Sequence, residues 1–395
     1  MKNQKGFAPV FIILGLFLLV VLGIWTSFFL KSQSQSGLNN NIDGPTCPNN
    51  SVYTVSPIAI EKILSIIPLG NIGAPDHILP TDHIYLMVKN DNNVDPSKAV
   101  SVFAPADITI TNITSHKTLR NGKVFSDDYY IEFSPCKDIK ARFDHVTALP
   151  PKLMILLSQN KGECEKNNPR PGDEFSYCRY NVKQEIKAGE ELEKAGGGAS
   201  TSLDFWTQDF RLKKLGYANP KRYFEDQFYI TCPIDYFEPS LKKTLSEKFG
   251  SWSGQKRTVE PLCGEVNQDI KGTAQGNWTS GDGYIDMPEH WVERLALAHD
   301  NIDPSIGIVA IGGVISKSVK IQFPFAQTGL KNRNFSQVTA DGNVYCYEGK
   351  TISTEEVPKG RVLIQLTDRT SLKAEYQQRR CDEGTIFSTP TVYRR

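Results

Sequence analysis

The stretch from Val182 to Phe205, which reads VKQEIKAGEELEKAGGGASTSLDF, constrains the fold more than any other part of the chain. Two short segments in it can form β-strands: Val182 to Ile186 and a segment around Leu192, with the Ala188-Gly189 turn between them. Three glycines then lead into Ser202-Leu203-Asp204-Phe205, where apolar side chains flank an acid. Because glycine adopts positive φ without a Cβ clash, glycines of this kind mark turns. We therefore expect a β-hairpin, a glycine-rich loop and a further strand.

Composition extends this expectation to the whole chain. The strand-forming residues Val, Ile, Thr, Tyr and Phe are plentiful, Gly and Pro are frequent, and stretches with helical periodicity are few, which is typical of a mainly β protein. A chain of 395 residues is long enough for two or three domains. Its 45 Lys and Arg residues balance 44 Asp and Glu residues, so the net charge of +1 gives no electrostatic footprint for nucleic acid.

The N-terminal residues indicate the compartment. Lys2 and Lys5 precede an uncharged, mostly apolar run from Phe7 to Leu30, and Lys31 follows it. Such a run can cross a hydrocarbon core of about 30 Å as a helix, and it is too long for a signal-peptide apolar region of about 7–15 residues. We expect residues 1–31 to form an uncleaved signal anchor that crosses the cell membrane once, with the bulk of the chain outside the cytoplasm. The polar residues 32–50 are then a flexible stalk.

Eight cysteines fit an exported chain, because disulfides persist outside a reducing cytosol. Their number is even, they are scattered, and none forms a C-x-x-C pair, which argues against zinc-ribbon and thioredoxin-like sites. Pairing cysteines that are close in the sequence predicts four disulfides: Cys164–Cys178, Cys232–Cys263, Cys346–Cys381 and, by remainder, Cys47–Cys136.

Several motifs, taken in order, resemble the lysostaphin-type (duplicated hybrid motif) zinc metallopeptidases, which cut peptidoglycan cross-bridges. In that family a V-x-x-G-x-x-I-x-x-x-G hairpin precedes a glycine-rich loop and an H-L-H-F strand, and Ser202 to Phe205 stands in that frame. Val100 to Ile110, VSVFAPADITI, is similar to the family's V-x-A-x-x-D-G-x-V turn, with Ile108 in place of the Gly, and Phe143 to Val146, FDHV, is similar to its Y-x-H-L. The resemblance covers roughly residues 68–210. It implies a barrel-sandwich β domain, which we place at residues 51–215.

The resemblance also implies a zinc site, and the chain departs from the family's ligands there. Both histidines of H-L-H-F are missing, and Ser202 and Asp204 stand in their places. The family's H-x-x-x-D before a strand is matched loosely by His77, Asp82 and His83, because His77 and Asp82 are five residues apart and His83 can take the place of the family's Asp. A zinc peptidase needs three protein ligands and a general base. The candidate metal ligands are His77, Asp82, His83 and Asp204, and the candidate catalytic residue is His145, which corresponds to the histidine of Y-x-H-L.

Three functions are open at this point. The first is a degenerate peptidase-like domain that binds cell-wall glycan or peptide, or an envelope protein, without cleaving it. In it Asp204 caps a backbone turn or pairs with His83 or His145 in a buried polar cluster, and no metal is required. The alternative is a zinc-dependent peptidoglycan hydrolase of the cell-wall endopeptidase type with an altered His/Asp ligand set. A third is a lipocalin-like ligand-binding module in the C-terminal half, where Gly276-Asn277-Trp278 resembles the G-x-W start of that family.

The C-terminal half, residues 216–395, lies outside the resemblance. Apolar residues at helical spacing predict a helix from Pro239 to Phe249, as they predict a short helix after Pro57 in the first half. From Gly272 onward strands alternate with turns, including strands over Ile306 to Ile311 and Arg361 to Leu366. This spacing predicts a second small β barrel or sandwich with few helices.

Overall fold

The computed structural model describes residues 44–395 except 50, 90, 92, 169, 170, 199 and 355, and these residues belong to one compact unit. The membrane anchor predicted at residues 1–31 and the stalk up to residue 43 lie outside the described residues. Within the described ranges, neither α-helix is long and apolar enough to span a bilayer.

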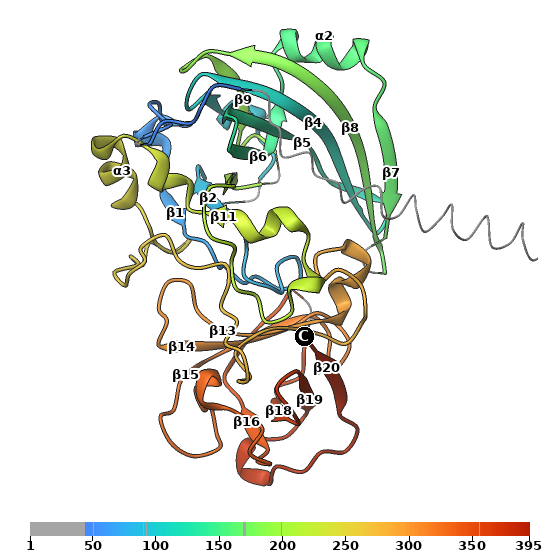
Figure 1. Ribbon diagram of the computed structural model, residues 1–395. Coiled ribbons are helices and arrows are strands. Elements are labelled where there is room, and N and C mark those ends of the chain that lie inside the picture. Colours follow the sequence, from blue (N-terminus) through green and yellow to red (C-terminus); the bar gives the residue numbers. More distant parts are fainter. Residues whose placement is uncertain are drawn as a thin grey trace, which may run out of the picture. The chain divides into compact units, whose positions relative to one another are not determined.

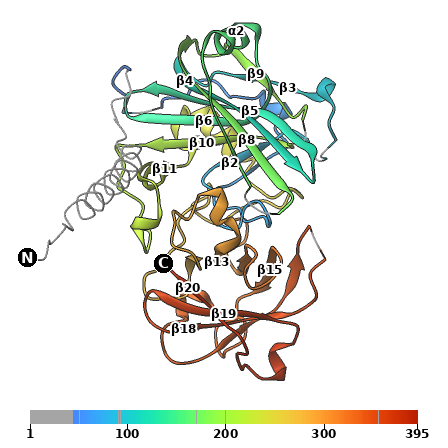
Figure 2. The same ribbon diagram turned by 90° about the vertical axis from the view of Figure 1, so that its right-hand side faces the viewer.

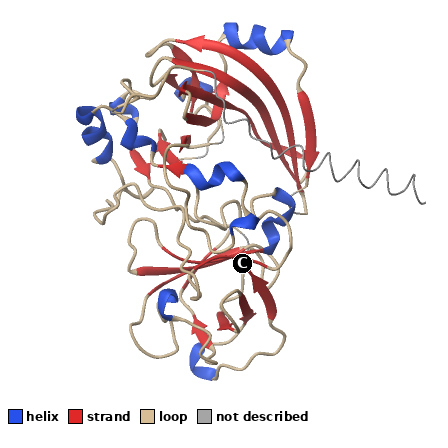
Figure 3. Ribbon diagram, viewed as in Figure 1, coloured by secondary structure: helices blue, strands red, loops and turns tan. Residues whose placement is uncertain are grey.

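The protein is mainly β, as its composition predicted, with two curled antiparallel sheets and two α-helices among the described residues (Figures 1 and 3). The helices are α2 (Pro151–Gln159) and α3 (Pro239–Ser246). The strands of the first sheet are β1 (Ser65–Ile67), β2 (Ile84–Met87), β3 (Val100–Phe103), β4 (Ile108–Arg120), β5 (Lys123–Cys136), β6 (Ile139–Ala148), β7 (Glu163–Asn167), β8 (Asp173–Ile186), β9 (Glu191–Ala195), β10 (Ser202–Asp209) and β11 (Ile230–Thr231).

The first sheet has the strand order β1-β2-β10-β6-β5-β4-β8-β7, with β11 paired to β10 and with β9 joining β3 to β6. Figure 2 shows its long strands β4, β5 and β8 curving together. The expected hairpin and final strand are present: β8 ends at Ile186, Gly189 has a φ of 78°, and β9 and β10 follow. Strand β10 lies between β2 and β6, so Leu203 runs beside the strand that carries His145.

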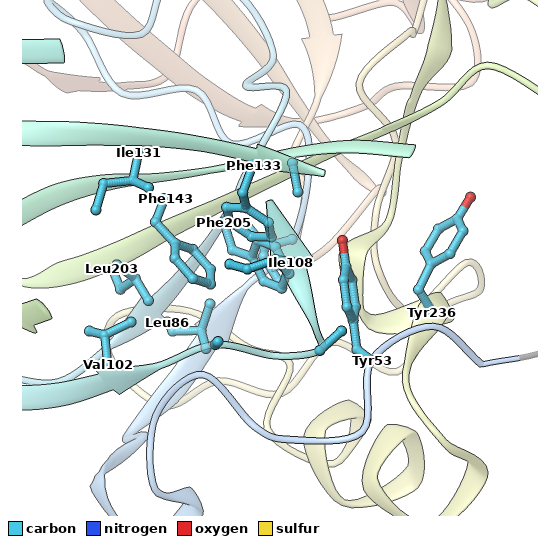
Figure 4. Close-up of a cluster of buried hydrophobic side chains, with 14 of the residues drawn as sticks. Tyr53, Leu86, Val102, Ile108, Ile131, Phe133, Phe143, Leu203, Phe205 and Tyr236 are labelled. Atoms are coloured by element: carbon cyan, nitrogen blue, oxygen red, sulfur yellow. The ribbon is translucent and has the colours of Figure 1, made fainter. Parts of the chain in front are cut away.

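The alternation of side chains along these strands separates a core from a polar face. Successive residues of a strand point to opposite sides. Leu203 and Phe205 of β10 and Phe143 of β6 are fully buried in the hydrophobic core, where the Phe143 and Phe205 rings are 4.8 Å apart (Figure 4). Asp204 and Asp144, which pair across the two strands, therefore lie on the opposite face.

The prediction of a short helix after Pro57 is wrong. Ile60–Lys62 forms one turn of 3-10 helix, and the chain then extends into β1, in which Ile66 pairs with Leu86 of β2. Of the four apolar residues expected on one helical face, Ile60, Ile63, Leu64 and Ile67, only Ile67 lies in β1, and all three residues of that strand are buried. The helix expected from Pro239 is confirmed as α3.

The second sheet contains the strands of the C-terminal half in the order β16-β18-β19-β20-β12-β13-β14-β15-β17. Two of them match the predicted strands in both bounds, namely Ile306 to Ile311 and Arg361 to Leu366. Its core is filled by large side chains that are fully buried, including Trp278, Tyr347 and Tyr393. The strands are β12 (Gly276–Thr279), β13 (Arg294–His299), β14 (Ile306–Ile311), β15 (Val319–Pro324), β16 (Tyr345–Tyr347), β17 (Lys350–Ile352), β18 (Arg361–Leu366), β19 (Ser371–Gln377) and β20 (Thr391–Arg394).

All four predicted disulfides are confirmed: Cys47–Cys136, Cys164–Cys178, Cys232–Cys263 and Cys346–Cys381. The third of them lies in the core of the first sheet, together with Phe237 and Leu245. This core therefore includes residues up to Cys263, well beyond the boundary at residue 215 that we expected between the two domains.

The loop from Pro68 to Thr81, which carries His77, packs against the second sheet. Ile72 and Ile78 share an apolar cluster with Ala296 and Ile308 of β13 and β14. The Asn301 side chain donates a hydrogen bond to the carbonyl of Pro68 (2.9 Å), and Lys320 Nζ donates one to the carbonyl of Ile72 (2.8 Å). These contacts hold the loop between the two sheets, at the entry to β2.

Candidate functional site

A cavity of about 710 Å³ lies on the polar face of the first sheet and contains every residue that the sequence singled out. His77, Asp82, His83, His145 and Asp204 all line it. The opposite wall comes from later parts of the chain and includes Tyr223, Trp291 and Arg294. The candidate residues are thus brought together, although they are far apart in the sequence.

Strand register explains how three of them meet. Asp204 of β10 lies opposite Tyr85 of β2, and His83 precedes Tyr85 by two residues, so His83, Tyr85 and Asp204 face the same side. His145 follows Asp144 directly and would point away in a regular strand. Its φ of 65° is unusual for a residue with a Cβ and coincides with a register irregularity between β5 and β6. This conformation lets Asp144 and His145 line the same cavity.

Asp204 is the centre of the cluster, and its side chain is 4% exposed. Its Oδ2 atom lies 3.3 Å from Nε2 of His83 and 3.5 Å from Nε2 of His145. Its Oδ1 atom accepts a hydrogen bond of 2.7 Å from the Ser202 hydroxyl. Ser202 and Asp204 are therefore hydrogen-bonded to each other, and the Asp204 carboxylate lies within 3.5 Å of two imidazoles.

Each imidazole has a second carboxylate at its other nitrogen. Nδ1 of His83 lies 2.8 Å from Oδ1 of Asp82, and Nδ1 of His145 lies 2.8 Å from Oδ2 of Asp128. Asp128 continues to His116, whose Nδ1 is 3.2 Å from Oδ1. The result is a chain of alternating acids and imidazoles in this order: Asp82, His83, Asp204, His145, Asp128 and His116.

The acids hold the two central imidazoles in their charged form. Burial disfavours a charge on His83, but Tyr85 and Asp204 outweigh burial and raise its pKa well above the ordinary value of 6.5. Burial also opposes a charge on His145, whereas Asp204 and Asp128 raise its pKa to about 9. Both shifts favour the charged form of the ring, in which each nitrogen carries a proton.

The outer acids respond in the opposite direction. Burial favours their neutral form, but hydrogen bonds from His83 lower the pKa of Asp82 to about 2. Hydrogen bonds from His116 and His145 likewise lower the pKa of Asp128 to about 2. His77 differs from its neighbours, because burial and the charge of His83 lower its pKa to about 4 and leave its ring neutral.

These donors do not fit a zinc ion. A metal-bound imidazole must offer a deprotonated nitrogen, whereas carboxylates lie within 3.5 Å of both nitrogens of His83 and His145 and raise the pKa of each ring, which favours the form without a free lone pair. Among the residues that the structure describes, no group of three or more His, Cys, Asp or Glu side chains is arranged to hold a metal ion. We derive no chemical step through zinc.

Sequence reasoning missed the partners that complete the cluster. Asp128 and His116 lie in β5 and β4, where they read only as polar positions of alternating strands. Arg142, whose Nε is 2.7 Å from Oδ1 of Asp144, was also missed. Trp291 follows His290, a pair that reads in the sequence as ordinary strand residues or as rings that can stack on a sugar. Its indole Nε1 is buried at the cavity wall and has no hydrogen-bond acceptor in the described part of the chain.

Comparisons with protein-family models, with curated proteins and with solved structures find no match to this chain, so any family assignment rests on the residues described above.

Proposed function

We propose that this chain is a membrane-anchored, extracytoplasmic binding protein whose first half is a degenerate, barrel-sandwich domain of the lysostaphin type. In this proposal the cavity binds a polar ligand of the cell envelope, a wall glycan or peptide, without cleaving it. Four disulfides are consistent with an oxidising compartment outside the cytoplasm. The order of β8, β9 and β10 and the convergence of His83, His145 and Asp204 are consistent with the kinship.

The observation that carries the proposal is the mutual neutralisation of the would-be catalytic groups. A hydrolase needs a base with a free lone pair beside the reacting atom. His145, the candidate base, is held in its protonated form between Asp128 and Asp204. A cavity whose ionisable groups are satisfied by one another is suited to holding a ligand rather than to activating water.

The cavity walls suit a ligand with sugar rings and charged groups. Tyr223 and Trp291 place aromatic rings in the cavity lining, on which sugar rings can pack. Arg142, Arg294 and Asp286 add charges of both signs to the lining. A volume of about 710 Å³ lies within the range of small-ligand sites.

The test uses the purified full-length chain and soluble peptidoglycan fragments. We expect calorimetric titration to show binding, fragment analysis to show no cleavage, and elemental analysis to show no stoichiometric zinc. Trp291→Ala, which removes an aromatic ring from the cavity lining, should weaken binding several-fold. Tyr284→Ala, at an exposed ring outside the cavity, is the matched control and should leave binding unchanged. Absence of binding by the wild-type chain would refute the proposal.

The second candidate is a zinc-dependent hydrolase with altered ligands, and one observation favours it. His83 and His145 both point Nε2 at the same oxygen of Asp204, and the neutral ring of His77 lies 5.6 Å from the ring of His83. Stoichiometric zinc that His83→Ala and Asp204→Ala abolish, together with cleavage of the fragments, would establish this candidate in place of the first. Nothing favours the lipocalin-like hypothesis, because buried aromatic side chains fill the core of the second sheet.

A further inference from the structure

A second cavity, of about 720 Å³, lies in the C-terminal half and has a basic lining. It is formed by the loop before β16, the β16–β17 turn, the segment that precedes β18 and the segment that follows β19. Its charged lining residues are the cations Lys331, Lys350, Lys359, Arg379 and Arg380 and the acids Glu348 and Glu383. Five cations against two acids give a local charge of +3, whereas the whole chain has a net charge of +1. We call this cavity the basic pocket.

The two acids of the basic pocket are engaged in its framework. Glu348 forms an ion pair with Lys331, and its other carboxylate oxygen accepts a hydrogen bond of 2.7 Å from the backbone N–H of Cys381. The disulfide from Cys381 to Cys346 ties the same two segments together. Glu383 accepts a hydrogen bond of 2.8 Å from the backbone N–H of Arg380. Glu348 is therefore paired with Lys331, while Glu383 keeps its negative charge against the four other cations of the pocket, which leaves an excess of three positive charges.

Three cations of the pocket have no such partner. Lys350, Lys359 and Arg379 are exposed, and none of them forms an ion pair within the described part of the chain. Three neighbouring cations without carboxylate partners give this part of the surface a positive electrostatic potential.

A buried charge beneath the pocket adds to its positive potential. Arg361 of β18 is 1% exposed, yet it contacts no carboxylate among the described residues. Its guanidinium donates to the side-chain oxygen of Gln377 (2.7 and 3.1 Å) and to the carbonyl of Arg380, which lines the pocket. Buried charges are usually paired, because an isolated charge is costly to remove from water. The buried Glu375 lies close enough for the charge of Arg361 to help lower its pKa, so this cation is offset in part, and the remainder strengthens the field that an anion would meet.

We propose that the basic pocket binds a ligand carrying several phosphate groups. Arginine guanidinium groups match phosphate oxygens in a two-pronged geometry, and lysines add point charges. Three unpaired cations can contact several linked phosphate groups at once, whereas a single phosphate group would engage fewer of them. Inorganic polyphosphate, a phosphate-bearing envelope polymer and a phospholipid surface share this chemistry. The site is separate from the cavity of the proposed function and does not depend on it.

The test titrates sodium tripolyphosphate into the full-length chain at low salt and repeats the titration at higher salt. The pocket variant is Lys350→Glu/Lys359→Glu/Arg379→Glu. We expect the wild-type chain to bind, binding to weaken as salt screens the charges, and the pocket variant to bind at least about tenfold more weakly, equivalent to about 1.4 kcal/mol. Inorganic phosphate and vesicles containing phosphatidylglycerol, used in parallel, identify the source: stronger binding of tripolyphosphate indicates a soluble or polymeric ligand, and stronger binding of vesicles a lipid surface.

The matched control is Lys123→Glu/Lys137→Glu/Lys213→Glu, which changes the net charge by the same amount at exposed lysines outside the pocket. Circular dichroism and the melting temperature show that both variants are folded. Equal loss of binding in the two variants would mean that only net charge matters and would overturn the proposal. So would a failure of the wild-type chain to bind any of the three phosphate probes at low salt.

Discussion

Replacing Asp204 with Asn tests whether the alternating chain of acids and imidazoles stabilises the fold. The amide keeps the shape of the carboxylate but removes the charge that His83 and His145 share at 3.3 and 3.5 Å. Removing one partner of a buried ion pair costs about 3–5 kcal/mol, because the other charge is left buried without compensation. The His145 side chain is 31% exposed, so water screens its interaction with Asp204. We therefore expect the free energy of unfolding to fall by the lower end of this range, about 3 kcal/mol near pH 6.

The sign of the pH dependence follows from the imidazoles. The pKa of His145 is raised from 6.5 to about 9 in the folded chain, so the stability that it contributes is fully present below about pH 6.5 and is lost as the pH rises through about 9. Asp204→Asn lowers the pKa of His145 toward its ordinary value. The difference in stability between wild type and variant should therefore be largest near pH 6 and should shrink at about pH 9.5.

Guanidinium denaturation of both chains, followed by tryptophan fluorescence at the two pH values, measures this difference. Asp127→Asn is the matched control, because that carboxylate is 63% exposed on β5, next to Asp128, and should change stability by less than about 0.5 kcal/mol. A loss below about 1 kcal/mol in Asp204→Asn, or a loss that does not depend on pH, would refute the charged-cluster reasoning.

Three further predictions concern other parts of the molecule. NMR titration of the His145 ring should give a pKa near 9, and a value at or below 6.5 would show that its carboxylates do not hold it charged. Gly349→Ala should destabilise the second sheet by about 1–3 kcal/mol, because the added Cβ would lie 2.1 Å from a backbone carbonyl oxygen of β15; Gly216→Ala, with nothing within 4 Å, should have little effect on the melting temperature. Replacing Cys47 and Cys136 with Ala should lower the free energy of unfolding by about 4 kcal/mol, because this disulfide closes a loop with a sequence separation of 89, and an unchanged denaturation midpoint would contradict this.

Much of the fold was readable from the sequence because it depends on local pattern. Ile306 to Ile311 is a continuous apolar run before two glycines, and it forms β14 with those bounds. The disulfides followed from pairing near neighbours in the sequence. The short helix after Pro57 failed for a tertiary reason. Its four apolar residues, Ile60, Ile63, Leu64 and Ile67, are too few to fix a helical period, and the pairing of Ser65–Ile67 with β2 decided the outcome.

The site was readable only in part. Asp204, His83 and His145 were found because motifs in a fixed order pointed to them. Asp128 was not, since an acid in an alternating strand ordinarily faces solvent, and only its register opposite the bend in β6 brings it to His145. The positive φ of His145 has no sequence signal, because neither Gly nor a turn motif marks that position. The wall with Trp291 depends on how the second half packs, which no local pattern encodes.

The exchange of residue types between β2 and β10 connects the proposed kinship with the proposed function. Under that kinship an acid precedes the first strand and histidines occupy the last, whereas here the imidazole of His83 precedes β2 and the carboxylate of Asp204 is on β10. An acid and an imidazole still face each other, so the pair keeps its complementary charges after the exchange. Asp82 and Asp128 lie 2.8 Å from the outer nitrogens of the two imidazoles and favour the protonated rings, which have no lone pair to offer a metal. Under the proposed function, the same cluster would stabilise the cavity without a metal ion.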